Sequence, residues 1–202
     1  NGGVLKADLG EENLDALEKG IPNLLKHVEN ITKVFNLPAV VAINRFYTDS
    51  EEEINLIKEK CQELGVNVAL SDVWADGGKG GEELAMEVIR LAEKGSKLEF
   101  AYDVNLPIKA KIEAIAKKIY GADGVEFSKK VSKEIDKFEK IGFGDLPICM
   151  AKTQYSLTDD PNVLGRPTGF NITIRDITIS AGAGFLVALT GDIMKMPGLP
   201  KV

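Results

Sequence analysis

Two short apolar segments of this chain each lead into an aromatic residue just beyond the point where a strand would end. Residues 40–43 precede Phe46, and residues 67–70 precede Trp74, the only tryptophan of the chain. If the segments form neighbouring parallel strands, both rings lie at the edge where open α/β folds bind ligands. The pattern favours an α/β fold that places Phe46 and Trp74 where two facing rings are able to enclose a flat ring.

Helix signals surround and separate the two predicted strands. Ser50 is followed three residues later by Glu53, which is the spacing of a capping box, and Gly65 ends that helical pattern. Because a helical crossover between two strands of one sheet is right-handed, we expect the strands to be parallel. Nearer the N-terminus, a helix is expected to end at Gly20 and a second one to begin at Pro22.

Polar residues follow both predicted strands. They are Asn44, Arg45, Thr48 and Asp49 after the first strand, and Ser71 and Asp72 after the second. Polar groups beside two aromatic rings suit a ligand that combines a flat ring with ionised or amide edges. Aromatic residues also pack in cores, so the residues alone leave open whether Phe46 and Trp74 bind a ligand or stabilise the fold.

Two amphipathic helices are predicted next, and the pattern changes after the second of them. Residues 107–120 predict an amphipathic helix, and a second one carries apolar residues from Phe127 to Phe138. Four lysines are expected on the solvated side of the first helix: Lys109, Lys111, Lys117 and Lys118. Strands are predicted at residues 147–152, 172–179 and 185–190. We therefore expect an α/β domain at residues 1–144, which includes the amphipathic helices, and a second, smaller, β-rich α+β part at residues 145–202.

Composition excludes several functional classes. The chain has 202 residues, of which 44% are hydrophobic, enough for a sizeable core. A net charge of -6 argues against a nucleic-acid surface, which needs a basic patch. The apolar runs are too short to span a membrane, and the chain does not open with a signal-peptide pattern. We expect a cytoplasmic protein without nucleic-acid or membrane partners.

The residues that most often bind metals are sparse. Cys61 and Cys149 have neither CxxC nor Cys/His spacing, and both are expected to be apolar core residues. His27 is the only histidine, which predicts no histidine-rich metal site, and we expect it to be structural or solvated. No nucleophile-base pair is recognisable, so no residue is assigned a catalytic role.

Two further segments allow two interpretations each. The loop at residues 77–81 is glycine-rich and precedes a predicted helix, so it is either a flexible connection or an anion-binding loop. Residues 152–156 directly follow a predicted strand and are unusually polar. They either line a cleft or hold the next loop in place through side-chain hydrogen bonds.

Long strings of this sequence resemble those of one enzyme family. The strings cover residues 40–49, 147–156 and 175–185, followed by residues 189–194 and 196–200. They closely resemble formate-tetrahydrofolate ligase, and the resemblance runs in the family's order from end to end. It identifies the chain as the C-terminal portion of such an enzyme.

The resemblance implies an ATP-dependent reaction of one-carbon metabolism. In the family, formate attacks the γ-phosphate of ATP to give formyl phosphate, and N10 of tetrahydrofolate then accepts the formyl group. The family's pterin ring lies between a phenylalanine and a tryptophan that match Phe46 and Trp74. A leucine that matches Leu70 contributes to the same pocket. The resemblance also implies Mg with the ATP and homo-oligomers of the full-length enzyme.

One departure from the family limits these expectations. Full-length members carry a phosphate-binding GxxxxGK(S/T) loop in an N-terminal portion, and this sequence contains no such loop. We therefore expect the folate side of an active site without the ATP side, and no ligase activity from the chain alone. The other interpretation is a noncatalytic folding or assembly module with Phe46 and Trp74 in its core. Exposure of the two rings distinguishes the interpretations.

Overall fold

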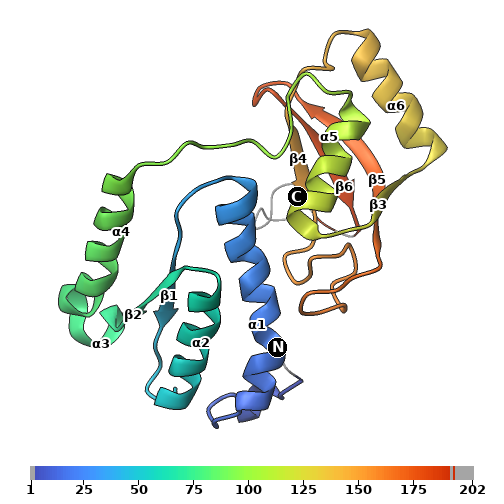
Figure 1. Ribbon diagram of the computed structural model, residues 1–202. Helices are drawn as coiled ribbons and strands as arrows, with labels where there is room; N and C mark the ends of the chain where they lie inside the picture. The colour runs from blue at the N-terminus through green and yellow to red at the C-terminus, as the bar shows by residue number, and fades with distance from the viewer. Residues whose placement is uncertain (1–2, 192, 194–202) are drawn as a thin grey trace. The chain divides into compact units, whose positions relative to one another are not determined.

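The computed structural model describes residues 3–191 and residue 193, and it has the expected α/β fold. The chain divides into two compact units, Asn1–Glu99 and Phe100–Val202, each considered below by itself (Figure 1). Among the described residues, no helix combines the length and apolar character needed to cross a membrane. The sequence strings at residues 189–194 and 196–200 extend beyond the described part of the chain.

The first unit contains the predicted strand-helix-strand arrangement. Its strands β1 and β2 are parallel, with Val40 opposite Asn67 and Asn44 opposite Ser71, which confirms the expected pairing. The short elements of the unit are η1 (Lys6–Asp8), η2 (Asn30–Val34), α3 (Val73–Asp76) and η3 (Gly77–Gly81). The longer elements are α1 (Leu14–Glu29), β1 (Val40–Asn44), α2 (Glu51–Glu63), β2 (Asn67–Ser71) and α4 (Glu82–Lys94).

The predicted capping box at the start of α2 is present. The Ser50 hydroxyl accepts from the Glu53 N–H at 3.2 Å, and the Glu53 carboxylate accepts from the Ser50 N–H at 3.3 Å. The same carboxylate also accepts from the backbone N–H of Asn13, whose side chain caps α1. Glu53 therefore links the N-terminal ends of α1 and α2.

The predicted break between two N-terminal helices is wrong. One helix, α1, continues through Gly20 and Pro22. A glycine inside a helix costs about 1 kcal/mol relative to alanine, and Pro22 has no N–H to donate to the carbonyl four residues earlier. The helix nevertheless buries Ile21 and Val28, and this burial outweighs the local penalties. Tertiary packing thus overrides the two local stop signals.

The second unit is a mixed sheet in the strand order β3-β5-β6-β4. Strand β3 is parallel to β5, β5 is antiparallel to β6, and β4 is parallel to β6. The helical elements are α5 (Ile108–Ile115), η4 (Ala116–Tyr120) and α6 (Lys129–Lys140). The strands are β3 (Gly124–Phe127), β4 (Ile148–Ala151), β5 (Asn171–Ser180) and β6 (Phe185–Thr190).

One face of this sheet packs against α5 and α6 to form the core. Along β5, Ile172 and Ile174 are fully buried while Thr173 is exposed, which is the alternation expected from the sequence. A bulge between Ile174 and Asp176 then shifts the register by one residue. Because of this shift, Ile177 returns to the buried face of the sheet.

The boundary between compact units lies at residues 99 and 100, not near residue 144. Strands β3 and β4 flank residue 144 in sequence, yet both belong to the same sheet. The reason is that β5 and β6 lie between them: β5 pairs with β3, and β6 pairs with β4. The two amphipathic helices therefore share a core with the C-terminal strands, and no composition change in the sequence marks this long-range pairing.

Two placements on this sheet differ from the expected ones. Phe127 lies in β3, and α6 begins only after Ser128, whose hydroxyl accepts from the Val131 N–H at 3.2 Å. Cys61 is buried as expected, but Cys149 is exposed. Strand β4 is at the edge of the sheet, and its residues Ile148 and Met150 pack against the core. Since side chains alternate along a strand, Cys149 faces the other way.

Lys111 is fully buried, although its position predicted a solvated lysine. Its ammonium group donates to the carbonyl oxygens of Gly144 at 2.6 Å and Leu146 at 2.9 Å. Burial lowers the pKa of Lys111, while the charges of Asp145 and nearby acidic residues act in the opposite direction. The lysine thus anchors the turn that leads from α6 into β4.

Candidate functional site

Phe46 and Trp74 lie at the same edge of the first sheet. Since β1 and β2 are parallel and in register to Asn44 and Ser71, the two residues follow the carboxyl ends of neighbouring strands. Phe46 is 56% exposed and Trp74 is 62% exposed. Neither ring is therefore a core residue of this unit, and both are accessible to a ligand.

The indole of Trp74 is hydrogen-bonded to the end of β1. Its Nε1–H donates to the carbonyl oxygen of Arg45 at 2.7 Å, directly before Phe46 in the chain. The strand pairing itself extends one residue further, because the Arg45 N–H donates to the carbonyl oxygen of Ser71 at 3.2 Å. The backbone that carries Phe46 is thus bonded both to β2 and to the tryptophan side chain.

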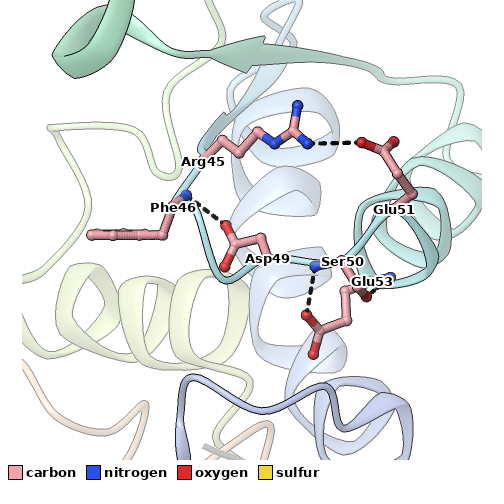
Figure 2. A network of polar contacts seen from close by, with 6 residues as sticks. All are labelled: Arg45, Phe46, Asp49, Ser50, Glu51 and Glu53. Carbon is pink, nitrogen blue, oxygen red and sulfur yellow. Dashed lines mark hydrogen bonds and ion pairs between the residues drawn. The ribbon is translucent and has the colours of Figure 1, made fainter.

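A tight turn follows Phe46 (Figure 2). The Phe46 N–H donates to Asp49 Oδ2 at 2.8 Å, and the Asp49 N–H donates to the Phe46 carbonyl oxygen at 3.1 Å. Arg45 forms an ion pair with Glu51 at 2.8 Å, and Figure 2 shows its side chain extending away from the Phe46 ring. The Arg45 guanidinium therefore stabilises the start of α2 and is not directed to the space beside Phe46.

Trp74 lies in the one-turn helix α3, and the glycine-rich segment packs against the start of that helix. The Asp72 N–H donates to the Gly80 carbonyl oxygen at 3.0 Å. A Cβ atom at Gly80 would lie 2.4 Å from the backbone carbon and oxygen of Asp72, so only glycine fits there. The segment at residues 77–81 is a 3-10 turn whose contacts hold the backbone before Trp74 in place.

The remaining predicted residues lie nearby or elsewhere. Leu70 pairs with Ile43 one residue before the end of β2 and is partly buried. His27 is exposed on α1. Within residues 3–191 and 193, no cluster of three or more histidine, cysteine, aspartate or glutamate residues is arranged to hold a metal ion.

A groove of about 770 Å³ lies at the other end of β2. It is lined by the first three residues of β2 and by residues of α2 and α4, and it includes neither Phe46 nor Trp74. Glu87 at this groove accepts hydrogen bonds from Arg90 and Asn67, and these bonds lower its pKa to about 2. Glu87 and Arg90 of this groove are thus paired with each other. We place the candidate site at the aromatic edge instead, where both rings are exposed.

In the second unit, the polar segment after β4 folds around Lys152. The ammonium group of Lys152 donates to the carbonyl oxygens of Thr153 at 2.9 Å, Thr158 at 2.8 Å and Ser156. It also lies 5.0 Å from the centroid of the Tyr120 ring. These contacts hold the following loop in place, one of the two roles that the sequence left open.

Burial lowers the pKa of Lys152 to about 8, against the opposite influence of the Asp159 charge. Between pH 8 and the ordinary pKa of 10.5, the unfolded chain therefore binds more protons than the folded chain. The contribution of Lys152 to the free energy of unfolding should rise with pH in this window and stay constant below it. Urea unfolding gives the free energy of unfolding of the parent and of Lys152→Met at about pH 7 and about pH 9.5. The value for the parent minus that for Lys152→Met should be larger at about pH 9.5 than at about pH 7. A difference that stays constant or becomes smaller as the pH rises would contradict the lowered pKa.

A parallel sheet with aromatic and polar side chains at its carboxyl edge is typical of α/β domains that bind a small molecule there. A family model described as formate–tetrahydrofolate ligase matches residues 1–202, the whole chain. The chain belongs to the formate–tetrahydrofolate ligase family. The family consists of ligases that use tetrahydrofolate and ATP.

The structure adds two residues that the sequence did not single out. Asp49 appeared only as one of several polar residues after β1. Its carboxylate bonds backward to the N–H three residues earlier, as the Glu of a capping box does. Gly80 lies in a run of glycines, and nothing in that run distinguishes it from its neighbours. Its role depends on the close approach of Asp72, which only the folded chain brings about.

Proposed function

We propose that this chain supplies the tetrahydrofolate-binding side of a formate-tetrahydrofolate ligase. In this proposal the pterin ring lies between Phe46 and Trp74, and Leu70 contributes to the same pocket. The observation that carries the proposal is that both aromatic side chains are more than half exposed at one edge of a parallel sheet. Membership of the family makes tetrahydrofolate the flat heterocycle of choice.

In the proposed reaction, a formate oxygen attacks the γ-phosphorus of ATP, and ADP leaves. N10 of tetrahydrofolate then attacks the carbonyl carbon of formyl phosphate, so a C–N bond forms, inorganic phosphate leaves and N10 loses its proton. The part of this chain is to bind and orient the folate, which converts the second step into a reaction between positioned groups. No residue of the chain is assigned to proton transfer.

We assign ATP and Mg to no residue of this chain. The sequence has no GxxxxGK(S/T) loop, and the described residues offer no acidic cluster for a metal. In the proposal these groups belong to an N-terminal portion of the full-length enzyme, which is a homo-oligomer of cytoplasmic one-carbon metabolism. The alternative, an assembly module with both rings in its core, is disfavoured by the exposure of Phe46 and Trp74.

The proposal is tested by adding tetrahydrofolate, or a stable folate analogue, to the chain. Since Trp74 is the only tryptophan, its emission reports on this site alone. Stacking contributes about 1–3 kcal/mol per aromatic ring, so two rings give binding between roughly millimolar and high-micromolar. We expect saturable quenching in this range after inner-filter correction. Quenching that does not saturate would overturn the proposed function.

We also expect the chain by itself to show neither formate-dependent ATP hydrolysis nor ligase activity. The physical reason is the lack of the loop whose backbone N–H groups surround nucleotide phosphates. Isothermal calorimetry with Mg-ATP should detect no tight binding. A sub-micromolar dissociation constant would show that the chain contains a nucleotide site of another kind.

A further inference from the structure

A single peptide group connects the two aromatic residues. The carbonyl oxygen of Arg45 accepts the hydrogen bond of the Trp74 indole at 2.7 Å, and the N–H of Phe46 donates to Asp49 Oδ2 at 2.8 Å. These carbonyl and N–H groups belong to the same peptide bond, which is planar and trans. A rotation of this plane that lengthens one hydrogen bond therefore also misaligns the other.

The carboxylate of Asp49 is well suited to hold this plane. A hydrogen bond from an N–H to a carboxylate is roughly twice as strong as one between neutral groups. It also polarises the peptide group, so the carbonyl oxygen at the other end becomes a better acceptor for the indole. The Asp49 N–H returns a bond to the Phe46 carbonyl at 3.1 Å, which closes the turn and keeps the carboxylate in position.

The other side chains drawn in Figure 2 form no hydrogen bond to the Arg45–Phe46 peptide group. Arg45 and Glu51 form an ion pair whose members are 33% and 64% exposed, and Figure 2 shows this pair on the opposite side of the backbone from the Phe46 ring. Ser50 and Glu53 form the capping box of α2. Of the three carboxylates in Figure 2, Asp49 is the one bonded to the backbone of Phe46.

We propose that Asp49 is a positioning residue for the aromatic pair, acting through the Arg45–Phe46 peptide group to orient Phe46 and the Trp74 indole together. The inference rests on the proposed folate function, because it assigns Asp49 a role in the preorganisation of that site. In this role Asp49 contacts the backbone of Phe46 and not the ligand. Preorganisation matters here because two exposed stacking rings supply little binding energy with which to order themselves.

The first test needs no ligand. The only tryptophan gives one indole N–H signal in a ¹H-¹⁵N spectrum, and its exchange with water reports the bond to Arg45. Asp49→Ala should speed this exchange about fivefold or more, whereas Asp49→Asn keeps an acceptor oxygen and should stay within about twofold of the parent. Glu52→Ala removes a nearby exposed carboxylate as a charge control and should have no effect. Equal exchange in Asp49→Ala and the parent would overturn the proposal.

The second test measures folate binding by quenching of Trp74 emission in the same variants. Asp49→Ala should weaken binding about fivefold, and Asp49→Asn should restore most of the loss. If Asp49→Asn binds as poorly as Asp49→Ala while its indole exchange matches the parent, Asp49 acts on the ligand through its charge, and the positioning role is wrong. If the parent shows no saturable quenching, the folate function fails, and indole exchange alone still decides the positioning role.

Discussion

Replacing Trp74 with alanine is expected to weaken the binding of a folate to this chain by about tenfold or more, because a loss of one stacking surface removes roughly 1–3 kcal/mol. Trp74 is 62% exposed, so the substitution leaves the core of the unit intact. It also removes the indole N–H bonded to Arg45, which frees the backbone before Phe46. Both effects weaken the binding of a folate.

Calorimetry is the appropriate measurement, because the variant has lost the only tryptophan. Trp74→Phe keeps an aromatic face without the N–H donor, so its affinity should fall between those of the parent and Trp74→Ala. Phe100→Ala removes another exposed aromatic ring, from the second unit, and serves as the matched control. If Trp74→Ala and Trp74→Phe both bind as well as the parent, the clamp does not exist and Trp74 is an ordinary surface residue.

The second large effect is expected from Lys111→Ala, which should lower the free energy of unfolding of the second unit by about 3 kcal/mol or more. Truncation of a long buried side chain leaves a cavity that typically costs about 2–5 kcal/mol. The carbonyl oxygens of Gly144 and Leu146 also lose their donor, and a buried unsatisfied group costs about 1–3 kcal/mol. Relief from burying the ammonium group offsets part of this loss.

Urea unfolding followed by far-UV circular dichroism measures this change, and Trp74 emission monitors the first unit separately. Lys111→Met fills the volume but offers no donor, so its stability should lie between those of the parent and Lys111→Ala. Lys117→Ala is the matched control, because the side chain of Lys117 is 52% exposed in the same helical segment. An exposed substitution usually changes stability by at most about 0.5 kcal/mol. A Lys111→Ala shift as small as that of Lys117→Ala would show that the buried ammonium group contributes little.

Local signals predicted the strand-helix-strand unit well. The spacing of Ser50 and Glu53 marked the start of α2, and the structure contains both hydrogen bonds of the capping box. The strands at residues 40–43 and 67–70 pair in parallel as expected. These features depend on residues close together in sequence and on one rule of chain connectivity, so a single sequence carries enough information for them.

Long-range pairing could not be inferred in the same way. Nothing near residue 144 shows that β3 and β4 join one sheet through β5 and β6. Nothing around Lys111 distinguishes it from its solvated neighbours, because its partners lie more than thirty positions away in sequence. Cys149 faces away from the core because side chains alternate along β4, and the face of β4 that is buried depends on its long-range pairing with β6.

The sequence by itself determined the α/β class, the family and the two aromatic residues of the candidate site. All three follow from local patterns: apolar strands with an aromatic residue after each, a capping box, and long strings that resemble the family. Only the tertiary structure decided that both rings are exposed, that Asp49 and Trp74 bond to opposite ends of one peptide group, and that Gly80 must be glycine. The physical reason is that hydrogen bonds and close contacts require interatomic distances that are correct to within a few tenths of an ångström. Such distances arise only when separate segments pack together.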